Sequence, residues 1–525
     1  MTQIEYLTPS FAQLHSDDED AIRCAADFLT IESPSARFSK AVRFGNWDGM
    51  VRLLRRPSNM FPAGLTPLVA ARLRKEGFQV TIKQWKRNDL PLVGAPPKLL
   101  GPEEDRDYQI SAVNIAIRDR RVELECPTGG GKTRIGADII RCLGGPVLWM
   151  VNTKTLLDQT AMELHRMLGQ KVTIVALGGG SKLSVQQILW HLQKGAVIVA
   201  TVQTLSRLQL GIQGWAMFKT LIVDEAHHAS AETWLKVADK LAGAWNRIGL
   251  SGTLDVKIPL LRSMRSIGAL GPTFKVTTTT ALADQGFLAR PTIIMNAIPR
   301  QDFLTYPQVR EAVLPDWRRD PRRLSKMGGE LFRFAYEAGI IENGSRNAKI
   351  SALAKHHSAL GEKVLILCSR IPHGQALFAL LSRDLPRVPV AWISGQERDD
   401  VRRETLAQFV TEGRRVLIAS TILQEGVDLP AIDTLILAGG GQSEIATIQR
   451  VGRSLRIRPD KNTVLIHDFL DGRYPFEEKD YLAQHTLERL RTYRRQGFAI
   501  DGMPEDMLQY LDEELRDHGP SETAL

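Results

Sequence analysis

The chain has 525 residues, 43% of them hydrophobic, which is enough for three or four domains with apolar cores of their own. Its four cysteines are far apart in the sequence, which excludes a zinc site or disulfide framework built on paired cysteines. No apolar run approaches the roughly 18 residues of a membrane span, so we expect a soluble, cytoplasmic protein.

The net charge of +9 is spread unevenly along the chain. Residues 1–36 carry seven acidic side chains against one arginine, whereas residues 37–89 carry twelve lysines and arginines against three acids. A concentration of positive charge of this kind indicates a polyanion-binding surface. A solvated basic face without a partner is the alternative.

The elements expected in chain order divide the sequence into blocks. A first block, residues 1–95, ends in a proline-rich connector at 91–97. Residues 100–290 alternate short β-branched runs with helical stretches, the pattern of a parallel sheet with helices on both faces. The strands expected there are Val122–Glu125, Val147–Val151, Val172–Ala176, Val197–Thr201, Leu221–Val223 and Arg247–Leu250.

Two motifs in this second block predict hydrolysis of a nucleoside triphosphate. The first strand runs into Cys126-Pro127-Thr128-Gly129-Gly130-Gly131-Lys132-Thr133, a glycine-rich loop whose backbone N–H groups can cradle phosphate oxygens. Lys132 is then placed to reach the β- and γ-phosphates, and the Thr133 hydroxyl to hold Mg²⁺. The fifth strand runs into Asp224 and Glu225, which would supply the other Mg²⁺ contact and polarise the attacking water. Cys126 occupies the position where the strict motif has its first glycine.

Residues 346–470 form another block in which strands and helices alternate, and this block has no phosphate-binding loop of its own. Its expected strands are Val364–Leu367, Val390–Ile393, Val416–Ala419, Thr434–Leu437 and Thr463–Ile466. Two such sheets with one phosphate loop predict a nucleotide held in the cleft between them. Residues 291–345 are interpreted as a linker with a helical insertion, and residues 471–525 as a charged helical tail.

The order of short motifs over about residues 100–470 resembles that of superfamily 2 helicases and translocases, which implies two RecA-like domains in tandem and ATP as the nucleotide. In the first domain, Arg106-Asp107-Tyr108-Gln109 resembles the segment in which Gln109 would read the adenine. The segments around Thr153 and around Thr201 and Gln203 resemble nucleic-acid contacts, although plain helix caps are the alternative. Ser251-Gly252-Thr253 matches the family's third motif.

In the second domain, Leu367-Cys368-Ser369-Arg370, the segment 420–430 and the segment 449–456 resemble the fourth, fifth and sixth motifs. The resemblance implies that Ser369, Arg370 and Thr421 contact nucleic acid and that Gly426 and Asp428 contact the nucleotide. It assigns Arg453 and Arg456 as arginine fingers that stabilise the charge of the transferring phosphoryl group, with Gln449 near the γ-phosphate.

The first block resembles the accessory domain of UvsW-type phage helicases, which are related to the XPB branch and act on branched DNA. The resemblance rests on residues 44–53 and 61–65, and it implies a small α+β domain in which Trp47 can serve as core. Arg43, Arg52, Arg55 and Arg56 would then bind DNA phosphates without sequence preference.

The resemblance implies an ATP-dependent DNA helicase that drives branch migration and fork regression in recombination, repair or replication. Its partners would be forked or junction DNA and single-strand-binding or recombination proteins, in a bacterial or phage-infected cell. The motor subunit of a restriction system and an RNA helicase remain as alternatives.

Overall fold

The computed structural model describes residues 1–36, 39–83, 92–94, 106–127, 129–178, 180, 183–252, 260–287, 290–318, 327–411, 416–420, 432–441, 463–473, 480–505, 507 and 509. The chain forms two compact units, Met1–Thr277 and Thr278–Leu525. Within the described ranges, every helix is too short or too polar to cross a bilayer.

The first unit begins with a small α+β block, as the sequence predicted. Its four-stranded sheet has the order β5-β2-β1-β6, in which only the β1–β6 pair is parallel. A separate antiparallel pair, β3–β4, carries the short helix α2. The elements are β1 (Thr2–Tyr6), β2 (Phe11–His15), α1 (Glu19–Phe28), β3 (Thr30–Glu32), α2 (Lys40–Arg43), β4 (Met50–Arg52), β5 (Met60–Pro62), η2 (Ala63–Leu65), α3 (Thr66–Lys75) and β6 (Val80–Lys83).

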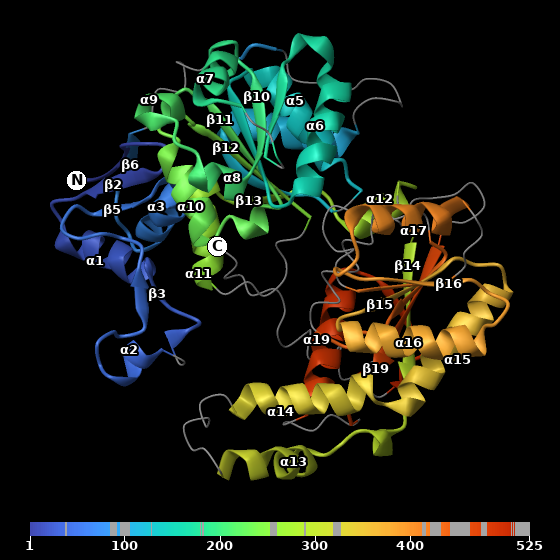
Figure 1. The fold of residues 1–525 in the computed structure, drawn as a ribbon. Helices are drawn as coiled ribbons and strands as arrows, with labels where there is room; N and C mark the ends of the chain where they lie inside the picture. The colour runs from blue at the N-terminus through green and yellow to red at the C-terminus, as the bar shows by residue number, and fades with distance from the viewer. Residues whose placement is uncertain are drawn as a thin grey trace. The chain divides into compact units, whose positions relative to one another are not determined.

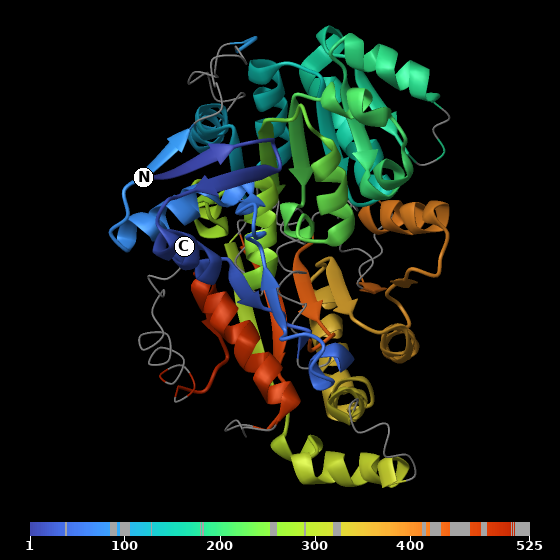
Figure 2. The same cartoon turned by 90° about the vertical axis from the view of Figure 1, so that its left-hand side faces the viewer.

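The second part of this unit is an all-parallel sheet of seven strands in the order β13-β7-β12-β11-β8-β10-β9. The strands are β7 (Arg121–Glu125), β8 (Val147–Val151), β9 (Ile174–Leu177), β10 (Val197–Thr201), β11 (Thr220–Asp224), β12 (Asn246–Ser251) and β13 (Thr273–Lys275). The six strands expected from the sequence are confirmed, and β13 is an additional edge strand. Helices cover both faces of the sheet, which is the arrangement of a RecA-like domain (Figures 1 and 2).

Alternating side chains explain the two buried faces. In β8, Trp149 packs with α4 (Asp107–Asp119), α5 (Lys132–Leu143) and α6 (Lys154–Leu168). Its neighbours Leu148 and Met150 pack on the opposite face. That face is covered by α7 (Val185–Gln193), α8 (Val202–Arg207), α9 (Gly211–Ala216) and α10 (Glu232–Lys240). Because both faces are buried, the strands are nearly continuous apolar runs, which is why the sequence identified them.

The α+β block and the parallel sheet share a core through α11 (Leu260–Leu270). Leu261, Met264 and Ile267 of α11 belong to the apolar cluster of the α+β block. Gly64 lies so close to this helix that a Cβ atom there would be 1.9 Å from the carbonyl oxygen of Ile267. The fully buried Arg247 of β12 donates a hydrogen bond of 3.0 Å to the Ser10 hydroxyl. The first block is therefore packed onto the first RecA-like domain.

The second unit contains another all-parallel sheet of seven strands, in the order β16-β17-β15-β18-β19-β14-β20. Its strands are β14 (Arg290–Ala297), β15 (Val364–Cys368), β16 (Val390–Ile393), β17 (Val416–Ser420), β18 (Thr434–Leu437), β19 (Thr463–Leu470) and β20 (Ala499–Asp501). Its helices are α12 (Thr279–Asp284), α13 (Tyr306–Arg318), α14 (Met327–Tyr336), α15 (Gly344–Ala359), α16 (Ile371–Asp384), α17 (Asp399–Thr411) and α19 (Tyr481–Arg495). The five expected strands are confirmed.

Two strands of this sheet lie outside the range from which the sequence predicted it. β14 lies in the segment interpreted as a linker, yet it pairs along its length with β19 and buries Ile293 and Met295. β20 follows the helix of the predicted tail and pairs with β14. The segment from 290 to 297 is therefore core rather than linker, and the tail contributes an edge strand as well as α19.

Candidate active site

The carboxyl ends of β7, β11 and β12, which are neighbours in the first parallel sheet, bring the predicted hydrolysis residues together. The glycine-rich loop follows β7, Asp224 ends β11, and Ser251 ends β12. Loops at the carboxyl edge of a parallel sheet are where open α/β folds bind their ligands. The order of motifs along the chain therefore becomes a cluster in space.

Lys132 is the buried cation of this cluster. Gly129 and Gly131 adopt φ of +84° and +83°, a left-handed conformation that glycine permits, and α5 begins at Lys132 directly after them. The Lys132 ammonium is shielded from solvent and donates no hydrogen bond within the described residues. Its Nζ lies 3.5 Å from Oε1 of Glu225. A buried ammonium at the mouth of a glycine loop fits a phosphate ligand.

Glu225 is the centre of a polar chain that runs from β11 to β12. Its backbone has φ +52°, an uncommon conformation for a non-glycine residue, and its N–H donates to Oδ1 of Asp224 at 3.0 Å. Oε2 of Glu225 lies 3.4 Å from Nδ1 of His227, which in turn lies 3.4 Å from the Ser251 hydroxyl. Strained backbone at a carboxylate of this kind is typical of functional sites. Thr253, the last residue of the third motif, lies outside the described residues.

Gln109 is buried beside the glycine loop. Its carbonyl oxygen accepts from the N–H of Arg106 at 3.0 Å, and its amide nitrogen donates to the Gly130 carbonyl at 2.9 Å. The Tyr108 hydroxyl donates to the same carbonyl at 2.9 Å. A side-chain amide has a further donor and acceptor, so the adenine contact stays a prediction. In this structure Gln109 stabilises the glycine-rich loop through its hydrogen bond to Gly130.

The remaining loop residues differ in what the structure describes of them. Cys126 is fully buried, and burial raises the pKa of its thiol to about 11, so it is neutral at physiological pH. Its N–H donates to the Ser251 carbonyl at 2.9 Å, which ties the start of the loop to β12. Pro127 and Thr133 flank the cradle, and Thr133 lies in the first turn of α5. Thr128 lies outside the described residues.

The nucleic-acid candidates of the first domain lie at helix starts on the same edge. Thr153 caps α6 by accepting from the Leu156 N–H at 3.3 Å. Thr201 caps α8 by accepting from the Thr204 N–H at 3.4 Å, and Gln203 is exposed on that helix. Both hydroxyls thus have the capping role that the sequence left open as the alternative. Their contact with nucleic acid remains a prediction.

In the second unit, Ser369 and Arg370 follow β15 as expected. The Arg370 guanidinium lies 5.8 Å above the Tyr336 ring, and the Tyr336 hydroxyl donates to the Gly439 carbonyl. Nη1 of Arg346 donates to the adjacent Ala438 carbonyl at 2.7 Å. The turn after β18 is therefore fixed by two helices. Six residues that the resemblance selected lie outside the described residues: Thr421, Gly426, Asp428, Gln449, Arg453 and Arg456.

A buried ion network near that turn was missed by sequence reasoning. Nε of Arg346 lies 2.8 Å from Oδ1 of Asp471, and all atoms of both side chains are inaccessible to solvent. Nε of Arg489 lies 2.8 Å from Oδ2 of Asp468, and its Nη2 lies 3.3 Å from Oδ2 of Asp471. Burying such ion pairs costs desolvation free energy. Removing one partner strongly destabilises the folded protein, because the other charge is then left buried without a partner. No local pattern identifies them, because Arg346 and Asp471 are 125 positions apart.

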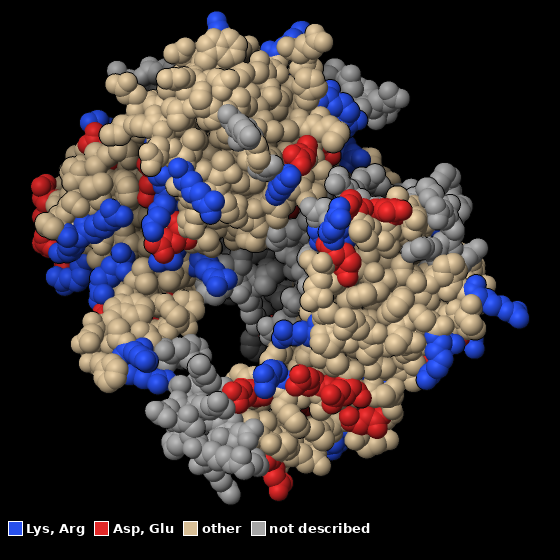
Figure 3. All heavy atoms as spheres, in the orientation of Figure 1, with Lys and Arg blue, Asp and Glu red and all other residues tan. Residues whose placement is uncertain are grey.

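The basic residues of the α+β block are occupied to different extents. Arg52 pairs with Asp48, Nη1 of Arg56 lies 3.6 Å from Oε2 of Glu19, and Arg55 lies 4.6 Å above the Phe11 ring. Arg43 on α2 has no ion pair within the described part of the chain. The Trp47 indole donates to the Met50 carbonyl at 3.0 Å, consistent with a packing role. Figure 3 shows Lys and Arg side chains gathered over this block.

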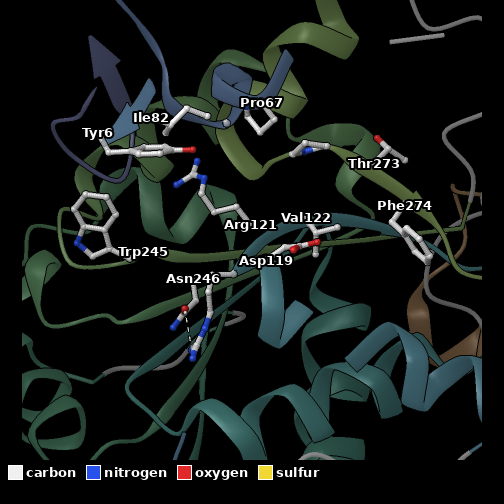
Figure 4. Close-up of a pocket in the computed structure, with 13 residues that line it drawn as sticks. Tyr6, Pro67, Ile82, Asp119, Arg121, Val122, Trp245, Asn246, Thr273 and Phe274 are labelled. Atoms are coloured by element: carbon white, nitrogen blue, oxygen red, sulfur yellow. Dashed lines mark hydrogen bonds between the residues drawn. The ribbon is translucent and has the colours of Figure 1, made fainter. Parts of the chain in front are cut away.

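A cavity of about 420 Å³ lies at the opposite, amino-terminal edge of the same sheet. Tyr6 and Ile82 line it from the α+β block, and Arg121, Trp245 and Asn246 line it from strand β7, the start of β12 and the loop before it (Figure 4). Among the described residues, none of the catalytic, nucleotide-binding or nucleic-acid-binding candidates lines this cavity. The cavity is thus distinct from the edge that holds Lys132 and Glu225.

Comparison with family models gives two matches, one in each block of parallel sheet. Residues 103–256 match the model described as "Type III restriction enzyme, res subunit". Residues 348–458 match "Helicase conserved C-terminal domain".

Individual relatives extend these matches. The "ATP-dependent DNA helicase uvsW" of Enterobacteria phage T4 is 25% identical over 515 residues, which cover 92% of this chain and 95% of the relative. The "DNA 3'-5' translocase XPB2" of Sulfurisphaera tokodaii is 26% identical over 395 residues, covering 70% and 82%. The crystal structure of T4 UvsW aligns with a TM-score of 0.44 and 23% identity over 95% of this chain and 98% of that chain.

Proposed function

This chain belongs to the superfamily 2 helicases, and we propose that it is an ATP-driven DNA motor that remodels branched duplexes. The observation that carries the hydrolytic part is the buried Lys132 ammonium, 3.5 Å from Glu225, at the mouth of a loop with left-handed glycines. The DNA part is supported by the match to a phage DNA helicase over 92% of this chain.

Each residue of the cluster has a defined task in this proposal. Lys132 would neutralise the β- and γ-phosphates, and Glu225 would accept a proton from the attacking water. Thr133 and Asp224 supply a hydroxyl and a carboxylate, the hard oxygen ligands that Mg²⁺ prefers, and Mg²⁺ would draw charge off the phosphates. The second domain would supply Arg453 and Arg456, placed by motif match alone.

The motor subunit of a restriction system is the second candidate, because the family model that matches residues 103–256 carries that description. This family match, however, lies entirely within the first RecA-like domain. The phage DNA helicase also aligns with the α+β block, because its match covers 92% of this chain. The branched-DNA proposal therefore has the wider support.

ATP hydrolysis measured with a set of matched nucleic acids tests the proposal. We expect forked DNA to raise kcat more than a linear duplex or single strand with the same numbers of paired and unpaired nucleotides. Fork regression should require hydrolysable ATP. A restriction motor would respond equally to forked and linear duplexes, and an RNA helicase would respond to RNA; either result would overturn the proposal.

A further inference from the structure

The β3–β4 pair carries a folded projection with α2 at its tip (Figure 1). The Ser33 N–H donates to the Gly49 carbonyl at 2.8 Å, which closes the base of the projection. At the tip, the Asn46 N–H donates to the Ala41 carbonyl at 2.8 Å, and Gly45, directly after the C-cap of α2, has φ +72°. These bonds give the residues of α2 a defined orientation.

The two aromatic residues of this tip differ in their exposure to solvent. Trp47 is half-buried and uses its indole N–H to bind the Met50 carbonyl. Phe44, at the C-cap of α2, is 75% exposed. Because helical residues three and four positions apart share a face, Lys40 lies on the same side as Arg43 and Phe44. The tip therefore presents one exposed aromatic ring on the same side as two exposed cations.

The two cations differ from the other basic residues of the block. Arg52 and Arg56 have acidic neighbours, Asp48 and Glu19. Lys40 and Arg43 have no ion pair within the described residues, so their charge is not neutralised locally. Other apolar side chains, such as Ile212 on α9 at 86%, are exposed too, and exposure of a single apolar side chain needs no special explanation. Phe44 differs from Ile212 because it adjoins a helix with two cations, Lys40 and Arg43, that have no ion pair within the described residues.

We propose that Lys40, Arg43 and Phe44 form a binding site for an unpaired nucleobase and its flanking phosphates. Phe44 would stack on the face of the base, and the two cations would bind the phosphates on either side. Paired bases hide their faces in the stack, so a duplex interior offers nothing to Phe44, whereas a branch point exposes such faces. This inference rests on the proposed function and specifies which feature of branched DNA the first block recognises.

Binding of nucleotide-free protein to two fluorescent DNAs tests the role of Phe44. One is a fork with 2-aminopurine at the first unpaired position, and the other is a fully paired duplex of equal length. Phe44→Ala should weaken fork binding by about 5- to 150-fold, the range of one base–aromatic stack, and leave duplex binding unchanged. Phe44→Tyr should retain the affinity and the 2-aminopurine quenching. Ile212→Ala, a matched loss of an exposed apolar side chain, should change neither DNA.

The cations are tested by the salt dependence of fork binding. Replacing Lys40 and Arg43 by Ala should lower the log–log slope by about 0.7 to 0.9 for each phosphate that the variant no longer neutralises. Equal fork affinity of Phe44→Ala and the unaltered protein, or an unchanged salt slope, would overturn the site. If the unaltered protein itself shows no DNA-stimulated ATPase, the proposed function fails; if it does, only the tip assignment fails.

Discussion

At the scale of single residues, Glu225 is the group that we propose as the base of the hydrolysis site. Its carboxylate lies within 3.5 Å of both the Lys132 ammonium and His227. We expect Glu225→Gln to keep nucleotide affinity but to lower kcat by about 10²- to 10⁴-fold, because the amide cannot accept the proton of the attacking water. Lys132→Ala should abolish turnover by removing the charge at the phosphates. For both variants, a steady-state ATPase assay with saturating DNA measures kcat, and binding of a fluorescent nucleotide measures affinity. Near-normal turnover in both variants would falsify the assignment.

Glu123 is a buried carboxyl group in the middle of β7 that makes stability depend on pH. Burial raises its pKa from about 4.5 to about 7, although hydrogen bonds from Ser266 and Thr273 oppose the shift. The folded state therefore holds a proton that the unfolded chain has lost. The resulting stabilisation is complete below the unfolded pKa and is lost as pH rises through about 7.

Glu123→Gln, which mimics the neutral form, should remove this dependence. We expect the unaltered protein to lose more thermal stability than the variant between about pH 5 and about pH 8. Glu163→Gln, a change of an exposed glutamate on α6, serves as the control. Melting temperatures of the three proteins at both pH values test this, and parallel curves for Glu123→Gln and the unaltered protein would contradict it.

At the scale of elements, the contact between η2 and α11 joins the α+β block to the first RecA-like domain. Gly64→Ala would place a methyl group 1.9 Å from the Ile267 carbonyl, so the two elements would have to separate. We expect a loss of about 1–3 kcal/mol in unfolding free energy, as for other overpacked cores. Gly344→Ala, where an added Cβ meets nothing within 4 Å, is the control. Denaturant unfolding measures both, and equal stability would show that the contact is dispensable.

The same contact means that the first block cannot be deleted without consequence for the motor. Its removal would expose Leu261, Met264 and Ile267, which are buried in the shared core. It would also leave the buried Arg247 without its Ser10 partner. Point substitutions on the surface of the block are therefore cleaner probes of DNA binding than truncation.

Tyr336 on α14 connects two loops at the carboxyl edge of the second sheet. Its ring faces Arg370, and its hydroxyl binds the Gly439 carbonyl in the turn that leads toward segment 449–456. Tyr336→Phe keeps the ring but removes one of the two contacts that hold the turn, so we expect kcat for ATP to fall by about 2- to 10-fold, the value of one hydrogen bond.

Tyr493→Phe is the matched control for this change, because it removes another buried tyrosine hydroxyl, 2.8 Å from Asp468, in the same unit. Both variants should lose similar thermal stability, but only Tyr336→Phe should lower kcat. Equal effects on kcat would reduce Tyr336 to a purely structural residue.

At the scale of the whole molecule, we predict that the sixth-motif arginines Arg453 and Arg456 contribute to ATP hydrolysis. A guanidinium that offsets the charge of the transferring phosphoryl group is worth about 10³-fold or more in kcat. Arg453→Ala should therefore lower kcat by about 10³-fold with little change in nucleotide affinity. Single-turnover hydrolysis beside nucleotide binding measures the two effects separately. Unchanged turnover would leave the motif without its assigned role.

The sequence by itself determined the two parallel sheets and the order of residues along their edges. Buried parallel strands such as β8 and β10 must be continuous apolar runs, so they are legible without a structure. The glycine-rich loop and Asp224-Glu225 could be located from the sequence for a related reason, since a phosphate-binding site needs particular residue types directly after a strand. Short edge strands carry too few residues for such a signal, which is why β13 and β20 escaped prediction.

Only the tertiary structure decided which distant residues meet. β14 was taken for linker because its pairing with β19, 173 positions along the chain, leaves no local trace. The Tyr336–Gly439 contact and the ion network around Asp471 have the same character. The burial of side chains was equally hidden: Trp47 and Phe44 are three positions apart in the sequence, but packing leaves Trp47 half-buried and Phe44 exposed. Local sequence sets the conformation of a segment, whereas burial is a property of what packs against it.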